Sequence, residues 1–152
     1  MIIGIGVDVV TPERLDQLLD EEDGGFEARV FTPGERDACR DRADRVAALA
    51  ARFAAKEACF KALGRGLGQG MAFHLVSVSE QESGQPRLEL SGAAAERAAA
   101  LGVTQLHVSL THDAGCVAAI VVLEGSDAAT PAGARARSRE TRRRSRSPKT
   151  SR

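Results

Sequence analysis

The last 28 residues of the chain have a composition that excludes them from a folded core. From Gly125 onward the sequence contains no Leu, Ile, Val, Phe or Met and is rich in Ser, Thr, Ala, Pro and Arg. Such a segment buries too little apolar surface to offset the conformational entropy that folding removes. We therefore predict one folded domain over residues 1–123 and a disordered Arg/Ser-rich tail over residues 124–152.

Charge divides at the same boundary. Residues 124–152 hold nine of the 21 basic residues and three of the 21 acidic ones, a net charge of +6, so the domain carries −6. A basic segment can contact nucleic acid or an acidic partner, but this one has no aromatic residues on which bases could stack. We expect a dispensable or solubilising tail, with an acidic partner as the first alternative and nucleic acid as the second.

The sequence is typical of a cytoplasmic protein that does not contact the membrane. It contains no apolar run of the roughly 18–20 residues that a membrane span needs. The N-terminus MIIGIGVDVV lacks the basic region and small-residue cleavage site of a signal peptide. Its three cysteines are widely spaced and indicate neither a disulfide framework nor a zinc site.

Strand-like and helix-like stretches alternate along the domain. Pro12 and Pro33 each follow a threonine, which is typical of a helix start, and Thr32 and Glu35 have the spacing of a capping box. The pattern predicts an α+β fold with a mainly antiparallel sheet packed against a long helix. The expected strands are 2–10, 73–79, 87–90, 106–111 and 116–123, and the expected helices begin after Thr11 and Thr32 and cover 44–63 and 93–101.

The long helix carries charges within or beside its apolar stripe. At about 100° per residue, Lys56 falls inside the stripe, and Glu57 and Lys61 line its edge. Charges there are costly unless they are paired or bound to a ligand. From periodicity alone, a Glu57–Lys61 pair with a snorkelling Lys56 is favoured over a ligand site.

Three further features are candidates for a site. Gly4, Gly6 and Asp8 share one face of the first strand, so something can approach closely beside a carboxylate. His112, at the end of a strand, is a candidate general base, a phosphate ligand or a structural histidine. The loop over 64–70 contains four glycines whose backbone N–H groups could approach a phosphate, but taken alone the pattern is weak and simple loop punctuation is the favoured explanation.

Five segments, in order along residues 1–123, together resemble one family. The chain is similar to holo-acyl-carrier-protein synthase, the short, stand-alone type of 4′-phosphopantetheinyl transferase. The tail lies outside the resemblance. The matching segments are G-I-G-V-D-V-V at 4–10, R-F-A-A-K-E-A-C-F-K-A-L-G at 52–64, G-x-P at 84–86, H-V-S-L-T-H at 107–112 and A-A-I-V-V at 118–122.

The resemblance implies a reaction and a metal. The family transfers phosphopantetheine from coenzyme A to a serine of apo-acyl carrier protein and releases adenosine 3′,5′-bisphosphate. By analogy, Asp8 and Glu57 are expected to bind a magnesium ion, which prefers one or two carboxylates plus water and phosphate oxygens. Lys61 is expected to neutralise charge on the diphosphate.

The resemblance also implies the contacts to coenzyme A. Arg52 and Lys56 are expected to contact its phosphates, and the loop at Gly64 and Gly66 is expected to border the site. Glu57, acting through a metal-bound water, is the first candidate for the general base. His112 is the second candidate, and a phosphate-binding or orienting role for it is equally open.

The expected partners also follow from the resemblance. Arg14 would contact the acidic acyl carrier protein, and the chain would form a homotrimer with active sites between subunits. The alternative is a catalytically inactive protein of the same fold that acts as a binding module, with its tail on nucleic acid or an acidic partner. Three positions depart from the family pattern: Gln85 replaces a usual lysine, Arg65 a common threonine and Cys116 a frequent aromatic residue.

Overall fold

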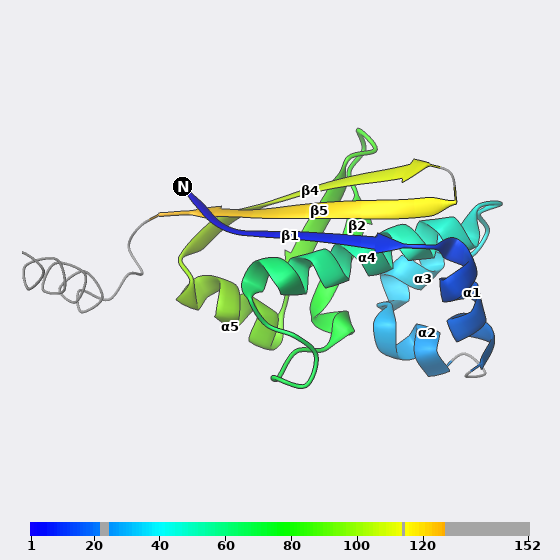
Figure 1. Ribbon diagram of the computed structural model, residues 1–152, viewed down its shortest axis with the longest axis horizontal. Coiled ribbons are helices and arrows are strands. Elements are labelled where there is room, and N and C mark those ends of the chain that lie inside the picture. The colour runs from blue at the N-terminus through cyan, green and yellow to red at the C-terminus, as the bar shows by residue number, and fades with distance from the viewer. Residues whose placement is uncertain (22–24, 114, 127–152) are drawn as a thin grey trace, which may run out of the picture.

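The chain folds as a three-stranded antiparallel sheet packed on one long helix (Figure 1). The computed structural model describes residues 1–21, 25–113 and 115–126. The sheet has the order β1 (Ile2–Val10), β5 (Cys116–Gly125), β4 (Val103–Asp113), and α4 (Arg45–Leu63) lies against it. A separate antiparallel pair joins β2 (Val76–Glu80) to β3 (Pro86–Leu90). The predicted α+β class is confirmed, with two sheets.

Shorter elements surround α4. The structure contains α1 (Pro12–Glu21), α2 (Gly25–Val30) and α3 (Pro33–Cys39) near one end, and α5 (Gly92–Ala100) toward the other (Figure 1). The helix α2 is an addition to the prediction. The capping box of α3 and the left-handed Gly64 that ends α4, with a φ of 63°, are as expected.

One predicted strand begins later than expected. Residues Phe73–Leu75 form a 3-10 helix rather than the start of a strand. The carbonyl groups of Phe73 and Val76 both accept hydrogen bonds from the Lys56 ammonium. The backbone therefore turns around this buried cation instead of extending past it.

The glycine face of β1 is occupied by the backbone of α4. A Cβ added at Gly6 would lie 1.8 Å from the Ala58 carbonyl oxygen, and one at Gly4 would lie 2.2 Å from that of Ala62. The close approach predicted beside Asp8 is therefore the packing of helix on strand. Strict alternation along β1 would place Ile3 on the same face as Ile5, Val7 and Val9. The register shifts between Ile2 and Gly4, and Ile3 packs against the core instead.

A buried ion pair joins three elements in the core. Lys56 on α4 is fully buried, and its Nζ lies 2.8 Å from an Oε atom of Glu35 on α3. Glu35 also accepts hydrogen bonds from the Thr32 N–H, as the α3 cap, and from the Val78 N–H on β2, both at 2.8 Å. The expected snorkelling of Lys56 is wrong, because a counter-ion lies inside the core.

The sheet ends where the two termini of the described chain meet. The Gly125 N–H donates to the Met1 carbonyl at 2.9 Å, so β5 continues two residues beyond the predicted 123. The predicted disordered tail lies, from residue 127, outside the described residues. Within the described ranges, no helix has the length and apolar character needed to span a membrane.

Candidate active site

Asp8 and Glu57 line the same cavity, although 48 residues separate them in the sequence. The cavity has a volume of about 320 Å³ and lies between the end of β1, helix α1 and helix α4. The backbone contact of β1 with α4 positions Asp8, and Glu57 faces it from α4. Arg14, on the first turns of α1, and Phe53, one turn before Glu57, complete this side. Three predicted site residues, Asp8, Arg14 and Glu57, are thus brought together.

Lys61 is bonded to Asp8. Its Nζ donates to Asp8 Oδ1 at 2.7 Å and to the Val7 carbonyl at 2.9 Å. The carboxylate that it pairs with is therefore on β1 and is not the Glu57 of the i,i+4 pattern. About half of the Lys61 side chain is exposed, whereas that of Asp8 is 16% exposed, so the ammonium can move toward solvent more easily than the carboxylate can.

The environment of Glu57 disfavours its negative charge. Burial is the main cause that raises the pKa of Glu57, and the negative charge of Asp8 raises it further. The Lys61 ammonium acts in the opposite direction. Two carboxylates that face the same cavity gain from a cation that neutralises both.

This pair of carboxylates suits a hard cation that keeps other ligands. Magnesium is commonly held by one or two carboxylates and takes water and phosphate oxygens for the rest of its octahedral shell. Among the residues that the structure describes, no group of three or more His, Cys, Asp or Glu side chains could hold a metal. The site therefore fits magnesium better than it fits a metal that needs a full protein cage.

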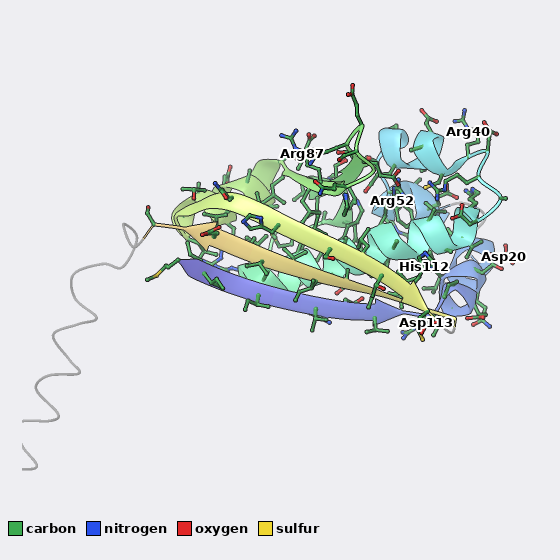
Figure 2. All side chains as sticks on the ribbon, turned by 90° about the horizontal axis from the view of Figure 1, so that it is seen from above. Asp20, Arg40, Arg52, Arg87, His112 and Asp113 are labelled. Atoms are coloured by element: carbon green, nitrogen blue, oxygen red, sulfur yellow. The ribbon has the colours of Figure 1, made fainter. Side chains whose placement is uncertain are left out.

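Arg52 and His112 line a second, larger cavity. It has a volume of about 550 Å³ and lies between α4, the β2–β3 hairpin and the end of β4. Figure 2 shows Arg52 on α4 and His112 near the end of β4. Arg42 and Glu80 also line the cavity.

The Arg52 guanidinium is held rigidly at the wall of this cavity. Its side chain is 6% exposed, Nη1 donates to the Ala48 carbonyl at 3.0 Å, and Nη2 donates to Glu80 Oε1 at 3.2 Å. Its buried Nε has no hydrogen-bond partner within the described structure. A guanidinium that is fixed at the wall of a cavity, with Nη2 facing a half-exposed carboxylate, is suited to binding an anion that replaces that carboxylate.

The two cavities lie at opposite edges of the sheet. Asp8 is on β1 and His112 is on β4, and β5 separates these strands, which puts them roughly 10 Å apart across two strand spacings. Gly64 and Gly66 are exposed and follow the far end of α4, roughly 10 Å from Glu57 along the helix axis. A single chain therefore brings together only part of the predicted site.

Lys56 lines neither cavity. Burial lowers the pKa of Lys56, and Glu35 opposes that shift. The ammonium bonds atoms of the core, namely Glu35 and two backbone carbonyls. This placement contradicts the expected contact of Lys56 with coenzyme A phosphates, because its side chain has no surface that a ligand could reach.

Sequence reasoning missed three residues that shape the site. The capping box identifies Glu35 as a helix cap, but its pattern carries no sign of a partner 21 residues away. Arg42 and Glu80 surround Arg52 only in the folded chain, since Glu80 is 28 residues from Arg52. The position of Lys56 in the apolar stripe was a signal for Glu35, because a buried cation requires a counter-ion somewhere in the fold.

Comparisons with known proteins agree on one family. A family model of the 4′-phosphopantetheinyl transferase superfamily matches residues 4–121. A holo-[acyl-carrier-protein] synthase from Trichlorobacter lovleyi is 44% identical over 124 residues, which cover 82% of this chain and 98% of that protein.

Solved structures are similar over the same part of the chain. The holo-[acyl-carrier-protein] synthase from Neisseria meningitidis matches with a TM-score of 0.75 and 31% identity, covering 82% of this chain and 99% of that one. The holo-(acyl-carrier-protein) synthase from Bacillus anthracis, in complex with CoA (3′,5′-ADP), matches with a TM-score of 0.68 and 33% identity, covering 83% and 99%.

Proposed function

Because the chain belongs to the 4′-phosphopantetheinyl transferase superfamily, we propose that it transfers phosphopantetheine from coenzyme A to a serine of apo-acyl carrier protein. The products are holo-acyl carrier protein and adenosine 3′,5′-bisphosphate. The observation that carries this proposal is the meeting of Asp8 and Glu57 at one cavity, with the Lys61 ammonium bonded to Asp8. Similarity to synthases, one of them in complex with CoA (3′,5′-ADP), supports it.

The transfer needs positive charge at the diphosphate. The serine oxygen forms a bond to phosphorus while the bond from that phosphorus to the bridging oxygen breaks, and the bridging oxygen leaves with negative charge. Asp8 and Glu57 would hold a magnesium ion, which, when bound, neutralises the diphosphate oxygens. The Lys61 ammonium, 2.7 Å from Asp8, adds a second positive charge for the leaving oxygen.

The serine proton must also be accepted. Glu57 is our first candidate, because its carboxylate lines the cavity and would accept the proton through an intervening water molecule. His112 is the second candidate. The His112→Gln variant tests the second candidate. Loss of the general base would remove the rise of kcat with pH, whereas loss of a phosphate ligand would mainly raise KM for coenzyme A.

The larger cavity is our candidate for the nucleotide end of coenzyme A. Its volume of about 550 Å³ lies within the usual range of about 300–1,000 Å³ for small-molecule sites. Arg52 and His112 supply nitrogen atoms for phosphate oxygens there. The backbone at Gly64 and Gly66 is proposed to border the ligand from the far end of α4.

Arg14 is the proposed contact for the carrier protein. It is exposed at the rim of the smaller cavity, next to Asp8 and Glu57. Arg14 is the basic residue of α1, whose exposed side chains Glu13 and Asp16 are acidic. On this helix, an acidic partner would therefore be attracted to Arg14. Arg14→Ala should raise KM for the carrier protein and leave KM for coenzyme A unchanged, with exposed Arg40→Ala as the control.

A homotrimer with shared active sites remains a proposal that the sheet surface supports. Ile5, Val7, Val9 and Ile120 are 43–60% exposed on the sheet face opposite α4. An apolar patch of this kind is typical of a protein interface. Within one chain the two cavities are apart. A neighbouring subunit docked on this sheet would allow the smaller cavity of one subunit to lie beside the larger cavity of the other.

Subunit mixing tests the shared site. In a cyclic trimer, mixing equal amounts of Asp8→Ala and His112→Ala chains gives about one quarter intact sites, if each site takes these residues from two subunits. We expect activity to return to about that fraction after dissociation and reassembly. Activity that stays at the level of the separate variants would contradict sharing.

The reaction itself is tested by label transfer. Coenzyme A labelled in its phosphopantetheine arm is incubated with the full chain, magnesium and apo-acyl carrier protein. We expect the label on the carrier serine, with one adenosine 3′,5′-bisphosphate released for each label. Binding of coenzyme A without transfer would instead favour the inactive binding module.

A further inference from the structure

A carboxylate lies among the cations of the larger cavity. Glu80, at the end of β2, accepts a hydrogen bond from Arg52 Nη2 at 3.2 Å. Its Oε1 also lies 3.8 Å from Arg42 Nη1. All three side chains line the cavity that we assign to the nucleotide end of coenzyme A. An incoming phosphate therefore meets arginines that already have a negative partner.

The charges that line this cavity balance. Arg42 donates two hydrogen bonds to Asp44, at 2.8 Å from Nε and 2.9 Å from Nη2. These hydrogen bonds lower the pKa of Asp44 and raise that of Arg42. Glu80 balances Arg52, so the cavity has no net formal charge when His112 is counted as neutral. A phosphate site usually carries an excess of positive charge.

The two side chains of the Arg52–Glu80 pair differ in how easily they can move. The Arg52 side chain is 6% exposed and is fixed by its bond to the Ala48 carbonyl, whereas the Glu80 side chain is 48% exposed. Glu80 can turn into water at little cost, because an ion pair with an exposed partner is weak. The Arg52 Nη2 that now bonds Glu80 becomes available to a ligand when the carboxylate turns away.

We propose that Glu80 sets the affinity of the larger cavity for nucleotide phosphates by competing with them for Arg52 and Arg42. Binding of coenzyme A displaces the Glu80 carboxylate, and the carboxylate returns when adenosine 3′,5′-bisphosphate leaves. Glu80 thus weakens the binding of both and speeds the release of the product. This inference rests on the proposed function, which gives the cavity its ligand.

The test compares Glu80→Gln with Glu82→Gln in the full chain. Glu82 is exposed in the turn that follows β2 and does not line the cavity, so it controls for the same change of charge. Calorimetric titration with adenosine 3′,5′-bisphosphate should show about tenfold tighter binding to Glu80→Gln at low salt. The gain should shrink as salt screens the charges, and adenosine, which lacks phosphates, should bind both variants equally.

Kinetics provide a second measurement. For Glu80→Gln, KM for coenzyme A should fall and inhibition by adenosine 3′,5′-bisphosphate should strengthen, while Glu82→Gln matches the unaltered chain. Unchanged nucleotide affinity in Glu80→Gln would overturn the inference. Weaker affinity would also overturn it, since Glu80 would then position Arg52 rather than compete for it.

The outcome also separates the inference from the proposed function. If the unaltered chain transfers phosphopantetheine and Glu80→Gln binds nucleotide no more tightly, the role of Glu80 is wrong and the function stands. If neither form binds adenosine 3′,5′-bisphosphate, the assignment of the cavity is wrong and the inference fails with it.

Discussion

Lys61 Nζ lies 2.7 Å from Asp8 Oδ1, so the cation proposed for the leaving group rests against the carboxylate proposed for the metal. Glu57 shares the cavity with Asp8, and its pKa is raised mainly by burial and further by that second negative charge. The ammonium partly neutralises the carboxylates in the chain as it stands. We propose that the same ammonium contacts a phosphate bound at this cavity.

Replacing Lys61 should therefore slow the reaction more than it weakens binding. Lys61→Ala is expected to lower kcat by about 10²–10³-fold, the usual effect of removing one charge-stabilising donor, with a smaller change in KM for coenzyme A. Steady-state kinetics with apo-acyl carrier protein measure both. Lys61→Arg keeps the charge and should retain part of the activity, and a kcat for Lys61→Ala within twofold of the unaltered chain would refute the role.

Glu57 should make the metal-free protein less stable at neutral pH. Because burial and Asp8 raise its pKa, the folded chain holds this proton to higher pH than the unfolded chain, whose carboxyl titrates near 4.5. Stability therefore falls as pH rises from about 4.5 through the folded pKa, and the cost is complete above that value. Glu57→Gln removes the cost.

Thermal unfolding in chelator measures this effect. At pH 7.5 Glu57→Gln should have a higher Tm than the unaltered chain, and the difference should vanish below pH 4.5, where both unfolded and folded carboxyls are protonated. Exposed Glu82→Gln is the control and should change Tm little at either pH. A lower Tm for Glu57→Gln at pH 7.5 would contradict the assigned cause of the pKa shift.

The Glu35–Lys56 pair should be costly to break from one side. Lys56→Met leaves the buried Glu35 carboxylate without its counter-ion and is expected to cost about 3–5 kcal/mol in the free energy of unfolding. The exposed pair of Arg40 with Asp37 gives the comparison, since Asp37→Ala should cost at most about 1 kcal/mol. Adding Glu35→Gln to Lys56→Met should cost less than the sum of the two single changes. If urea denaturation gave the same loss in the free energy of unfolding for Lys56→Met and Asp37→Ala, the buried pair would not contribute more to stability than the exposed pair.

Gly6 should tolerate no side chain. In Gly6→Ala the new Cβ would lie 1.8 Å from the Ala58 carbonyl oxygen and 2.7 Å from the Ala62 nitrogen, so β1 must move away from α4. We expect a loss of about 3 kcal/mol or more in stability and reduced activity, because Asp8 moves with its strand. Gly34→Ala, whose Cβ would meet nothing within 4 Å, should change stability by less than about 0.5 kcal/mol. Similar stabilities of the two variants in urea denaturation would rule out the tight packing.

Much of the fold follows from local patterns. The 3.6-residue period and Gly64 define α4, and the Thr32–Glu35 spacing defines the start of α3, because both depend on neighbouring residues. The orientation of Ile3 and the 3-10 turn at Phe73 could not be predicted in this way. The first follows from a bulge in the pairing with β5, and the second accompanies the hydrogen bond to Lys56.

The candidate site also contains features that the sequence predicts and features that it does not. The resemblance picks out Asp8 and Glu57, and the contact of β1 with α4 does bring them to one cavity. Lys56 and Arg52 lie four residues apart on the same helix, yet one is bonded inside the core and the other lines a cavity. Periodicity assigns a residue to a face of a helix, but it does not predict which side chain from a distant part of the sequence contacts that face.

The most direct test of the central claim is the intact mass of an apo-acyl carrier protein after incubation with this chain, coenzyme A and magnesium. We predict a mass gain equal to one phosphopantetheine group, which is lost with Asp8→Ala, with Glu57→Ala and in chelator. An unchanged mass, from folded protein that still binds coenzyme A, would contradict the proposed transfer.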